Sequence, residues 1–308
     1  MSGIAFLFPG QGSQFVGMGA SFVESSPSAK ARVEEANDAL GFDIWKLITE
    51  GPEQELALTA NTQPAILLVS ALAYEALIAA KPVAPTAVAG HSLGEFSACW
   101  SAGVFSFRDA IRIVRKRGEL MQSAVPQGEG AMAAVIGLAP EEVASACAEA
   151  GGAVAPANFN SPEQTVIAGA TADVDKAMEV LKSRGAKKIV KLQVSAPFHT
   201  NLMKPAQDGL AGFMEMIEFN DPKFPIVRNV DAGVSRTAAE VKDGLLRQVT
   251  GCVRWVDSMR LLPTMGVSKA VELGPGKVLA GLMKRIDKTI ETVSIGSMEE
   301  LLKSVETV

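Results

Sequence analysis

The segment Gly90-His91-Ser92-Leu93-Gly94 constrains the fold of this chain more than any other feature. It follows a short apolar run over residues 86–89 and precedes a helical pattern over residues 93–102. A G-x-S-x-G motif between a strand and a helix holds its serine on a tight turn, with the side chain clear of the sheet. The motif therefore predicts a strand–elbow–helix unit in which Ser92 is the candidate nucleophile.

Short apolar runs alternate with helical patterns on both sides of this elbow. An apolar strand over residues 4–8 ends at Pro9-Gly10, and a polar, glycine-rich loop follows it. We expect helices over residues 20–40, 62–80, 93–102 and 107–123. Such alternation is typical of an α/β fold with a mainly parallel sheet. The apolar stretch 64–80 contains Glu75 and is too short to span a bilayer, so we expect a buried core helix.

The middle of the chain changes character after the linker at residues 125–130. The patterns predict strands over residues 131–137, 153–157, 164–168 and 187–194, helices over 140–150 and 173–183, and a turn at Asn160-Ser161-Pro162. The order β-α-β-β-α-β is the ferredoxin-like signature. We therefore expect a ferredoxin-like subdomain at residues 127–197, inserted into one core formed by residues 1–126 and 198–308.

The larger fold resumes at His199. We expect helices over residues 200–218, 237–249 and 253–264, a strand over 267–273, and a further helix that starts at Gly274-Pro275-Gly276.

The composition excludes several classes of function. The chain has 308 residues, 48% hydrophobic and 20% charged, which fits a soluble globular protein with a large core. A net charge of −5 gives no basic excess for nucleic acid. Three scattered cysteines and two histidines form no metal set and suggest a reducing compartment. The N-terminal residues lack the basic segment of a signal peptide, so we expect a cytoplasmic protein without a membrane partner.

A serine nucleophile needs a base to accept its proton, and the histidines offer two candidates. His91 adjoins Ser92, so its side chain should diverge from the serine on a tight turn, and a packing or hydrogen-bonding role is expected. His199 is the better candidate base. No carboxylate stands out as its orienting partner, but a backbone carbonyl can accept the second imidazole N–H.

Seven stretches of the chain closely resemble the malonyl-CoA:acyl carrier protein transacylases, and they run in family order along the whole chain. They are Phe8-Pro9-Gly10-Gln11-Gly12-Ser13-Gln14, Thr62-Gln63-Pro64-Ala65, Gly90-His91-Ser92-Leu93-Gly94-Glu95, Arg117-Gly118, Asn158-Phe159-Asn160-Ser161-Pro162, Ala196-Pro197-Phe198-His199 and Glu272-Leu273-Gly274-Pro275-Gly276. The family has an α/β-hydrolase-like core that carries a ferredoxin-like insert, in agreement with the pattern.

The resemblance implies roles for the reacting groups. Ser92 is the residue that becomes malonylated, and His199 is its general base and later its acid. The backbone N–H groups of Gln11 and Leu93 form the oxyanion hole. A main-chain carbonyl near Gln248 orients His199, although residues 245–249 match the family only loosely.

The resemblance also implies how the acyl group is selected. Arg117 pairs with the malonyl carboxylate, for which a guanidinium offers a bidentate fork. The residues alone do not single it out, because Arg112, Arg115 and Lys116 precede it on the same predicted helix. Gln63 borders the acyl site. Leu after the serine and Phe before the histidine accompany malonyl use in related domains, so Phe198 would crowd an α-methyl group, or it merely packs.

The expected cycle is a ping-pong transfer from malonyl-CoA to the phosphopantetheine thiol of acyl carrier protein, supplying fatty acid synthesis. The coenzyme A thioester is the substrate, and no cofactor or metal is expected; we expect a monomer. Three alternatives stay open. They are a serine thioesterase or esterase, a non-catalytic carrier-binding or scaffold protein, and a malonyltransferase that serves another carrier, such as a malonate decarboxylase subunit.

Overall fold

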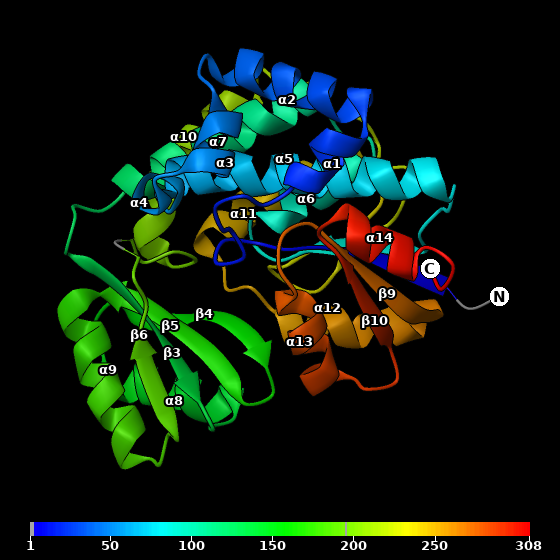
Figure 1. Ribbon diagram of the computed structural model, residues 1–308. Coiled ribbons are helices and arrows are strands. Elements are labelled where there is room, and N and C mark those ends of the chain that lie inside the picture. Colours follow the sequence, from blue (N-terminus) through cyan, green and yellow to red (C-terminus); the bar gives the residue numbers. More distant parts are fainter. Residues whose placement is uncertain (1–2, 195) are drawn as a thin grey trace.

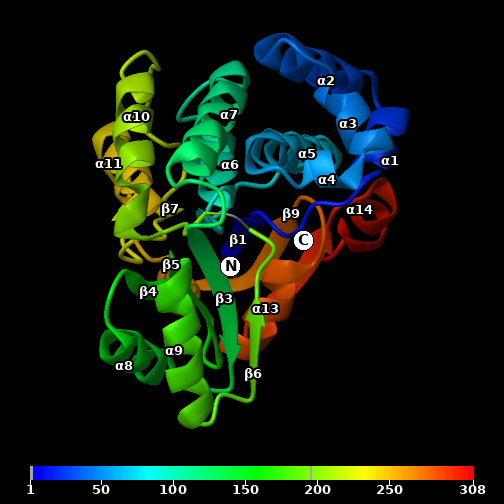
Figure 2. The same ribbon diagram turned by 90° about the vertical axis from the view of Figure 1, so that its left-hand side faces the viewer.

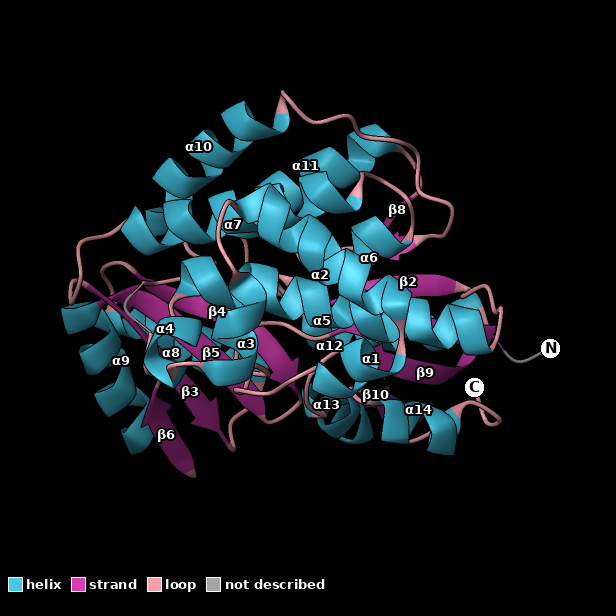
Figure 3. Cartoon of the chain, turned by 45° about the horizontal axis from the view of Figure 1, so that its top comes forward, coloured by secondary structure: helices cyan, strands magenta, loops and turns pink. Residues whose placement is uncertain are grey.

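The computed structural model describes residues 3–194 and 196–308 and shows two separate sheets in this part of the chain (Figures 1 and 3). Sheet A has the strand order β10-β9-β1-β2-β7-β8, and sheet B has the order β4-β5-β3-β6. The strands of sheet A are β1 (Gly3–Phe8), β2 (Ala87–Gly90), β7 (Ile226–Val227), β8 (Val234–Ser235), β9 (Val267–Leu273) and β10 (Glu291–Ile295). Those of sheet B are β3 (Gly130–Ile136), β4 (Val154–Ser161), β5 (Gln164–Ala170) and β6 (Lys188–Lys191).

Sheet A is mainly parallel, which confirms the predicted fold class. Strand β1 pairs in parallel with β2 and β9, β9 with β10, and β2 with β7, whereas β7 and β8 are antiparallel. Alternate residues of β1 enter different cores, with Phe6 and Phe8 on one face and Ala5 and Leu7 on the other. A strand buried on both faces reads as a continuous apolar run, and β1 and β2 were predicted for that reason. Strands β7, β8 and β10 are too short or too polar to give such a run.

Helices cover both faces of sheet A (Figure 1). The larger core involves α1 (Ala20–Ser25), α2 (Pro27–Leu40), α3 (Ile44–Glu50), α4 (Glu53–Leu56), α5 (Thr59–Ala80), α6 (Gly94–Ser101), α7 (Phe107–Ser123), α10 (Lys204–Met214), α11 (Ala238–Thr250) and α14 (Met298–Ser304). The smaller core lies under α12 (Trp255–Leu261), the 3₁₀ helix η2 (Leu262–Met265) and α13 (Val278–Ile286).

Helix α5 is longer than the expected core helix. It starts at Thr59 and has 22 residues, so in the described part of the chain its length and composition would suffice to cross a membrane. However, 67% of its most apolar window is buried inside the protein, and Figure 1 shows it running among other helices. The expectation of a core helix is confirmed. However, the evidence for it is the burial of α5 inside the protein, and not a length too short to span a bilayer.

The strands of sheet B and two helices follow the predicted β-α-β-β-α-β order (Figure 2). Helices α8 (Pro140–Ala150) and α9 (Thr171–Ser183) share one apolar cluster with the strands. Two details differ from the prediction. Strand β4 continues through Asn160 and Ser161, so the turn lies at residues 162–163. Strand β6 ends at Lys191, because pairing with β3 stops after Leu192 N–H donates to the Met132 carbonyl.

Prolines interrupt three of the predicted helices. Pro27 starts α2 and separates it from α1, Pro205 lies in the first turn of α10 after the 3₁₀ helix η1 (Asn201–Met203), and Pro263 begins the change from α12 to η2. A proline lacks the backbone N–H that a helix interior needs, so it favours a first turn, and Pro64 inside α5 is an exception. The helix expected from Gly274-Pro275-Gly276 likewise starts only at Val278.

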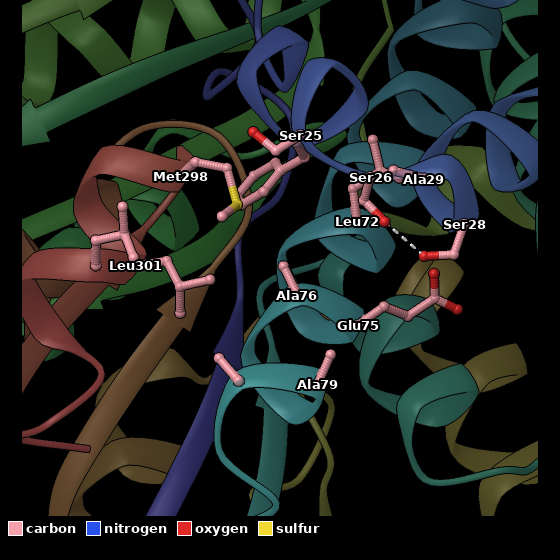
Figure 4. A pocket seen from close by; sticks show the side chains of 13 residues that line it. Ser25, Ser26, Ser28, Ala29, Leu72, Glu75, Ala76, Ala79, Met298 and Leu301 are labelled. Atoms are coloured by element: carbon pink, nitrogen blue, oxygen red, sulfur yellow. Dashed lines mark hydrogen bonds between the residues drawn. The ribbon is translucent and has the colours of Figure 1, made fainter.

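A cavity of about 300 Å³ lies between α1, α2, α5 and α14 (Figure 4). Its lining is largely apolar and includes Leu72, Ala76, Met298 and Leu301, with Glu75 and three serines at its edge. None of the predicted site residues lines this cavity.

Glu272 gives a structural role to the stretch Glu272-Leu273-Gly274-Pro275-Gly276, one of the seven that carry the family resemblance. It lies near the end of β9 with 0% of its surface exposed. Its two carboxylate oxygens accept hydrogen bonds from the backbone N–H groups of Leu279 and Ala280 in the first turn of α13, and from Ser294 Oγ. A carboxylate at this position satisfies the free donors of a helix N-terminus and favours its dipole. Glu272 therefore fixes α13 to sheet A.

We predict that Glu272→Gln lowers the free energy of unfolding by about 1–3 kcal/mol, because an amide NH₂ group would face a backbone donor in a buried site. Denaturant titration measures this loss. The control is Glu299→Gln, which removes an exposed ion pair with Lys303 and an exposed charge in the first turn of α14, and should change stability by less than about 1 kcal/mol. Equal losses in the two variants would contradict the capping role.

Candidate active site

Ser92 lies at the tip of the turn between β2 and α6 with a φ of 51°. This left-handed conformation is unfavourable for a residue with a Cβ atom, and it persists only where the surroundings enforce it. The turn is very tight. A Cβ atom on Gly90 would lie 1.9 Å from the Gly94 backbone, and one on Gly94 would lie 2.0 Å from the Phe8 carbonyl oxygen. Both glycines are therefore required for the approach of the elbow to β1.

Ser92 and His199 meet although they are 107 positions apart in sequence. The Oγ atom lies 2.7 Å from His199 Nε2, and Nδ1 lies 2.9 Å from the Gln248 carbonyl oxygen. Because a carbonyl only accepts, Nδ1 carries the proton and leaves Nε2 free to accept from Oγ. Burial, and next the charge of Arg117, lowers the pKa of His199 to about 3. The ring is therefore neutral at pH 7 and able to act as a base.

His91 points away from this pair. Its Nε2 atom lies 2.7 Å from Asn160 Oδ1, and its ring packs edge-on against Trp255 with the centroids 5.3 Å apart. The contacts of His91 thus link the elbow to β4 and α12. They leave His199 as the histidine in hydrogen-bond contact with Ser92 Oγ.

Arg117 projects from α7 into a second cavity, the one around Ser92, and is 2% exposed. Its Nη1 donates to Gln63 Oε1 at 2.9 Å, and its Nη2 donates to Gln248 Oε1 at 2.8 Å and to Ser92 Oγ at 3.2 Å. Burial lowers its pKa to about 10, against the opposing charge of Glu95, so the guanidinium stays charged at pH 7. The neighbouring Arg112 and Arg115 instead form ion pairs with carboxylates on α7 itself.

The cavity around Ser92 has a volume of about 110 Å³. Residues from the part of the chain built on sheet A and from the part built on sheet B line it. The lining residues from the part built on sheet A are Gln11, Gln63, His91, Ser92, Leu93, Arg117, Met121, Phe198 and His199. The other lining residues are Met132 in β3, Asn158 in β4, and Leu192 and Val194 after β6. All the predicted site residues except Gln248 line this cavity, and Gln248 lies directly behind it.

Gln11 and Leu93 offer backbone donors to this cavity. Among residues 3–194 and 196–308, neither N–H group has a hydrogen-bond acceptor. Free N–H groups at the start of a helix favour a negative charge, and Leu93 directly precedes the first residue of α6. The arrangement is suited to an oxyanion that develops on a substrate carbonyl bound at Ser92.

Two residues of the site were missed in the sequence. Asn229 is fully buried, accepts the Ser92 N–H through Oδ1 at 2.7 Å, and donates through Nδ2 to the Gly90 carbonyl at 2.7 Å. No motif surrounds it, so the sequence carries no signal. Glu95 is 1% exposed, and mainly burial raises its pKa to about 7. Its place beside the elbow motif was the signal that could have identified it.

The fold and the comparisons identify the class of protein as an acyltransferase. Residues 5–298 match the acyl transferase domain family. The malonyl CoA-acyl carrier protein transacylase of Escherichia coli (strain K12) is 46% identical over 308 residues, which cover 99% of this chain and 100% of that protein. The chain belongs to the family of malonyl CoA-acyl carrier protein transacylases.

Solved structures of similar proteins have the same fold. An acyl carrier protein S-malonyltransferase from Vibrio cholerae has a TM-score of 0.95 and 46% identity, with coverage of 98% of this chain and 99% of that chain. A malonyl-transacylase in complex with a type II PKS acyl-carrier protein has a TM-score of 0.97 and 45% identity, with complete coverage of both chains.

We predict that Gly94→Ala destabilises the protein by about 3 kcal/mol, because the added Cβ atom must displace the β1 backbone. Gly281→Ala is the matched control. A Cβ atom there meets nothing within 4 Å, and the substitution should stabilise α13 by about 0.5–1 kcal/mol. Denaturant unfolding of the two variants checks the opposite signs, and a neutral effect of Gly94→Ala would refute the required close approach.

The lowered pKa of His199 predicts how stability depends on pH. Below pH 6.5 the unfolded chain binds a proton at His199, which the folded chain does not bind until about pH 3. Lowering the pH in this window therefore favours unfolding, and full stability returns above pH 6.5. Between pH 6.5 and 5 the wild type should lose about 2 kcal/mol relative to His199→Gln. Parallel stability curves for the two proteins would show that His199 protonates normally in the fold.

Proposed function

We propose that this protein transfers the malonyl group of malonyl-CoA to the phosphopantetheine thiol of acyl carrier protein, through an ester on Ser92. The observation that carries the proposal is that Arg117 is buried without a salt-bridge partner among the described residues. It is buried against Ser92 Oγ, and in the described residues it forms no salt bridge, because Gln63 and Gln248 offer it neutral oxygens. A buried cation without a paired anion favours a substrate that brings its own carboxylate.

The first half of the reaction transfers the malonyl group to the enzyme. His199 Nε2 takes the proton of Ser92 Oγ as the oxygen attacks the thioester carbonyl carbon. The negative charge moves to the carbonyl oxygen, which faces the N–H groups of Gln11 and Leu93. When the carbon–sulfur bond breaks, His199 returns the proton to the sulfur, and coenzyme A leaves as a thiol.

The second half repeats these steps with a different thiol. The carrier's phosphopantetheine thiol gives its proton to His199 while its sulfur attacks the Ser92 ester. The carbon–oxygen bond then breaks, and Ser92 recovers its proton. The cycle moves one acyl group and one proton in each half, so we propose that it needs no cofactor or metal.

The lining of the cavity suggests why malonyl is accepted. The malonyl carboxylate can occupy the Arg117 fork in a bidentate manner, with Gln63 beside it. Phe198 and Leu93 line the same small cavity, and their bulk would disfavour an α-methyl branch. A pocket of this kind discriminates one methylene by about 1–3 kcal/mol.

We further propose that residues 127–197 form a subdomain that closes over the core. Met132, Asn158 and Leu192 lie in this range and line the cavity above Ser92. Their apolar and amide surfaces would limit the access of water to the ester. We also propose that the protein is a monomer in the cytoplasm and that a carrier protein is its partner.

Labelled malonyl-CoA tests the proposal directly. We expect the label on Ser92 without carrier, and on the carrier when acyl carrier protein is added. Rapid release of free malonate would indicate a thioesterase, and the absence of label would indicate a non-catalytic protein. Stable label on Ser92 that acyl carrier protein does not remove would indicate a malonyltransferase that serves another carrier.

We predict that Arg117→Ala lowers kcat/KM for malonyl-CoA by about 100-fold or more, whereas transfer of an acetyl group changes far less. The reason is that acetyl has no carboxylate to pair. Arg115→Ala is the control on the same helix, since Arg115 pairs with Glu119 and bonds Asn61 outside the cavity. Equal losses for malonyl and acetyl transfer would refute the carboxylate role.

A further inference from the structure

Glu95 is a buried carboxylate that the reaction described above does not use. It lies in the first turn of α6 but does not line the cavity, so it cannot touch the substrate. A buried carboxylate is unfavourable unless hydrogen bonds compensate for lost hydration. Its Oε2 atom accepts two such bonds, from Gln248 Nε2 at 2.7 Å and from the Asn229 backbone N–H at 3.1 Å.

Gln248 depends on this carboxylate for its orientation. Its Nε2 also donates to the Ser92 carbonyl at 2.9 Å, while its Oε1 accepts from Arg117. An amide rotated by 180° would set its NH₂ group against the Arg117 donor, and its oxygen against Glu95. Glu95 therefore holds the amide oxygen toward Arg117. The carbonyl of the same residue accepts from His199 Nδ1, so one residue orients both groups.

Asn229 receives the second bond of Glu95. The Asn229 backbone is fixed by Glu95 Oε2, and the side chain bridges the Ser92 N–H and the Gly90 carbonyl. These two bonds close the elbow around a serine held at a φ of 51°. Through two amide residues, one carboxylate oxygen is thus connected to Ser92, His199 and Arg117.

We propose that Glu95 is a positioning residue for acyl transfer, which fixes Gln248 and Asn229 and through them the geometry of Ser92, His199 and Arg117. Its charge has a second effect, because it is the nearby anion that opposes the loss of charge at Arg117. The kinetic consequences rest on the function proposed above, whereas the geometric consequences do not.

The test compares Glu95→Ala, Glu95→Gln and Glu272→Gln. Glu95→Ala removes both hydrogen bonds, whereas Glu95→Gln can keep them through its amide oxygen and loses only the charge. Glu272→Gln is the matched control, since Glu272 is equally buried and accepts three hydrogen bonds, none from a site residue. All three are compared at equal folded fraction, measured by circular dichroism.

The first readout is the single-turnover rate of Ser92 malonylation from malonyl-CoA. We expect a loss of about 100-fold in Glu95→Ala, because small displacements of reacting groups have effects of this size. Glu95→Gln should recover most of the rate, and Glu272→Gln should match the wild type. A rate in Glu95→Ala within about threefold of wild type, or an equal loss in Glu272→Gln, would overturn the proposal.

The second readout is independent of the substrate. The chain has two histidines, so ¹⁵N-labelled histidine gives a spectrum with two imidazole rings. In Glu95→Ala the Nδ1–H resonance of His199 should move while the Nε2–H resonance of His91 stays, and Glu272→Gln should move neither. An unmoved His199 resonance would overturn the proposal. If malonyl-CoA fails to acylate the wild type, the proposed function fails, and this spectrum alone decides the role of Glu95.

Discussion

The hydrogen bond between Ser92 Oγ and His199 Nε2 is the interaction on which the rest of the site depends. Both residues adopt left-handed backbone conformations, with φ values of 51° and 61°. Such conformations cost about 1–3 kcal/mol each in a residue other than glycine. The structure offsets this cost with hydrogen bonds to each segment. Asn229 and Gln248 donate to the Gly90 and Ser92 carbonyls of the elbow, and His199 donates to the Gln248 carbonyl. The Ser92–His199 pair is thus held in a strained geometry that the surrounding core maintains.

Burial has opposite chemical consequences for the two basic groups of the site. It lowers the pKa of His199 far enough that the ring is neutral and can accept a proton. It also lowers the pKa of Arg117, but only to about 10, so the guanidinium keeps its charge. A single cavity therefore contains one neutral base and one fixed cation. This combination suits a reaction in which a serine attacks an acyl group that carries a carboxylate.

The parts of the fold that could be predicted are those encoded locally. The elbow follows from glycines at fixed spacing, and β1 and β2 follow from apolar runs buried on both faces. Prolines divided helices that the apolar pattern alone had joined, as at Pro27 and Pro263. The short strands β7 and β8 depend on strand pairing, and no local sequence pattern predicts them.

The same distinction applies to the site. Ser92 and His199 could be proposed because the motif needs a base and the chain offers few. Arg117 could be selected from its run only through the family resemblance, since its burial is a tertiary property. Asn229 acts through contacts with residues 137 and 139 positions away, so nothing near it in the sequence marks its place.

A crystal structure of the protein after brief exposure to malonyl-CoA would show directly whether Ser92 and Arg117 bind the malonyl group. We predict an ester on Ser92 whose carbonyl oxygen lies within hydrogen-bond distance of the Gln11 and Leu93 N–H groups. We also predict that the free carboxylate is bound by both terminal nitrogens of Arg117. An unmodified Ser92, or an ester whose carboxylate points to solvent while Arg117 keeps its present partners, would contradict it.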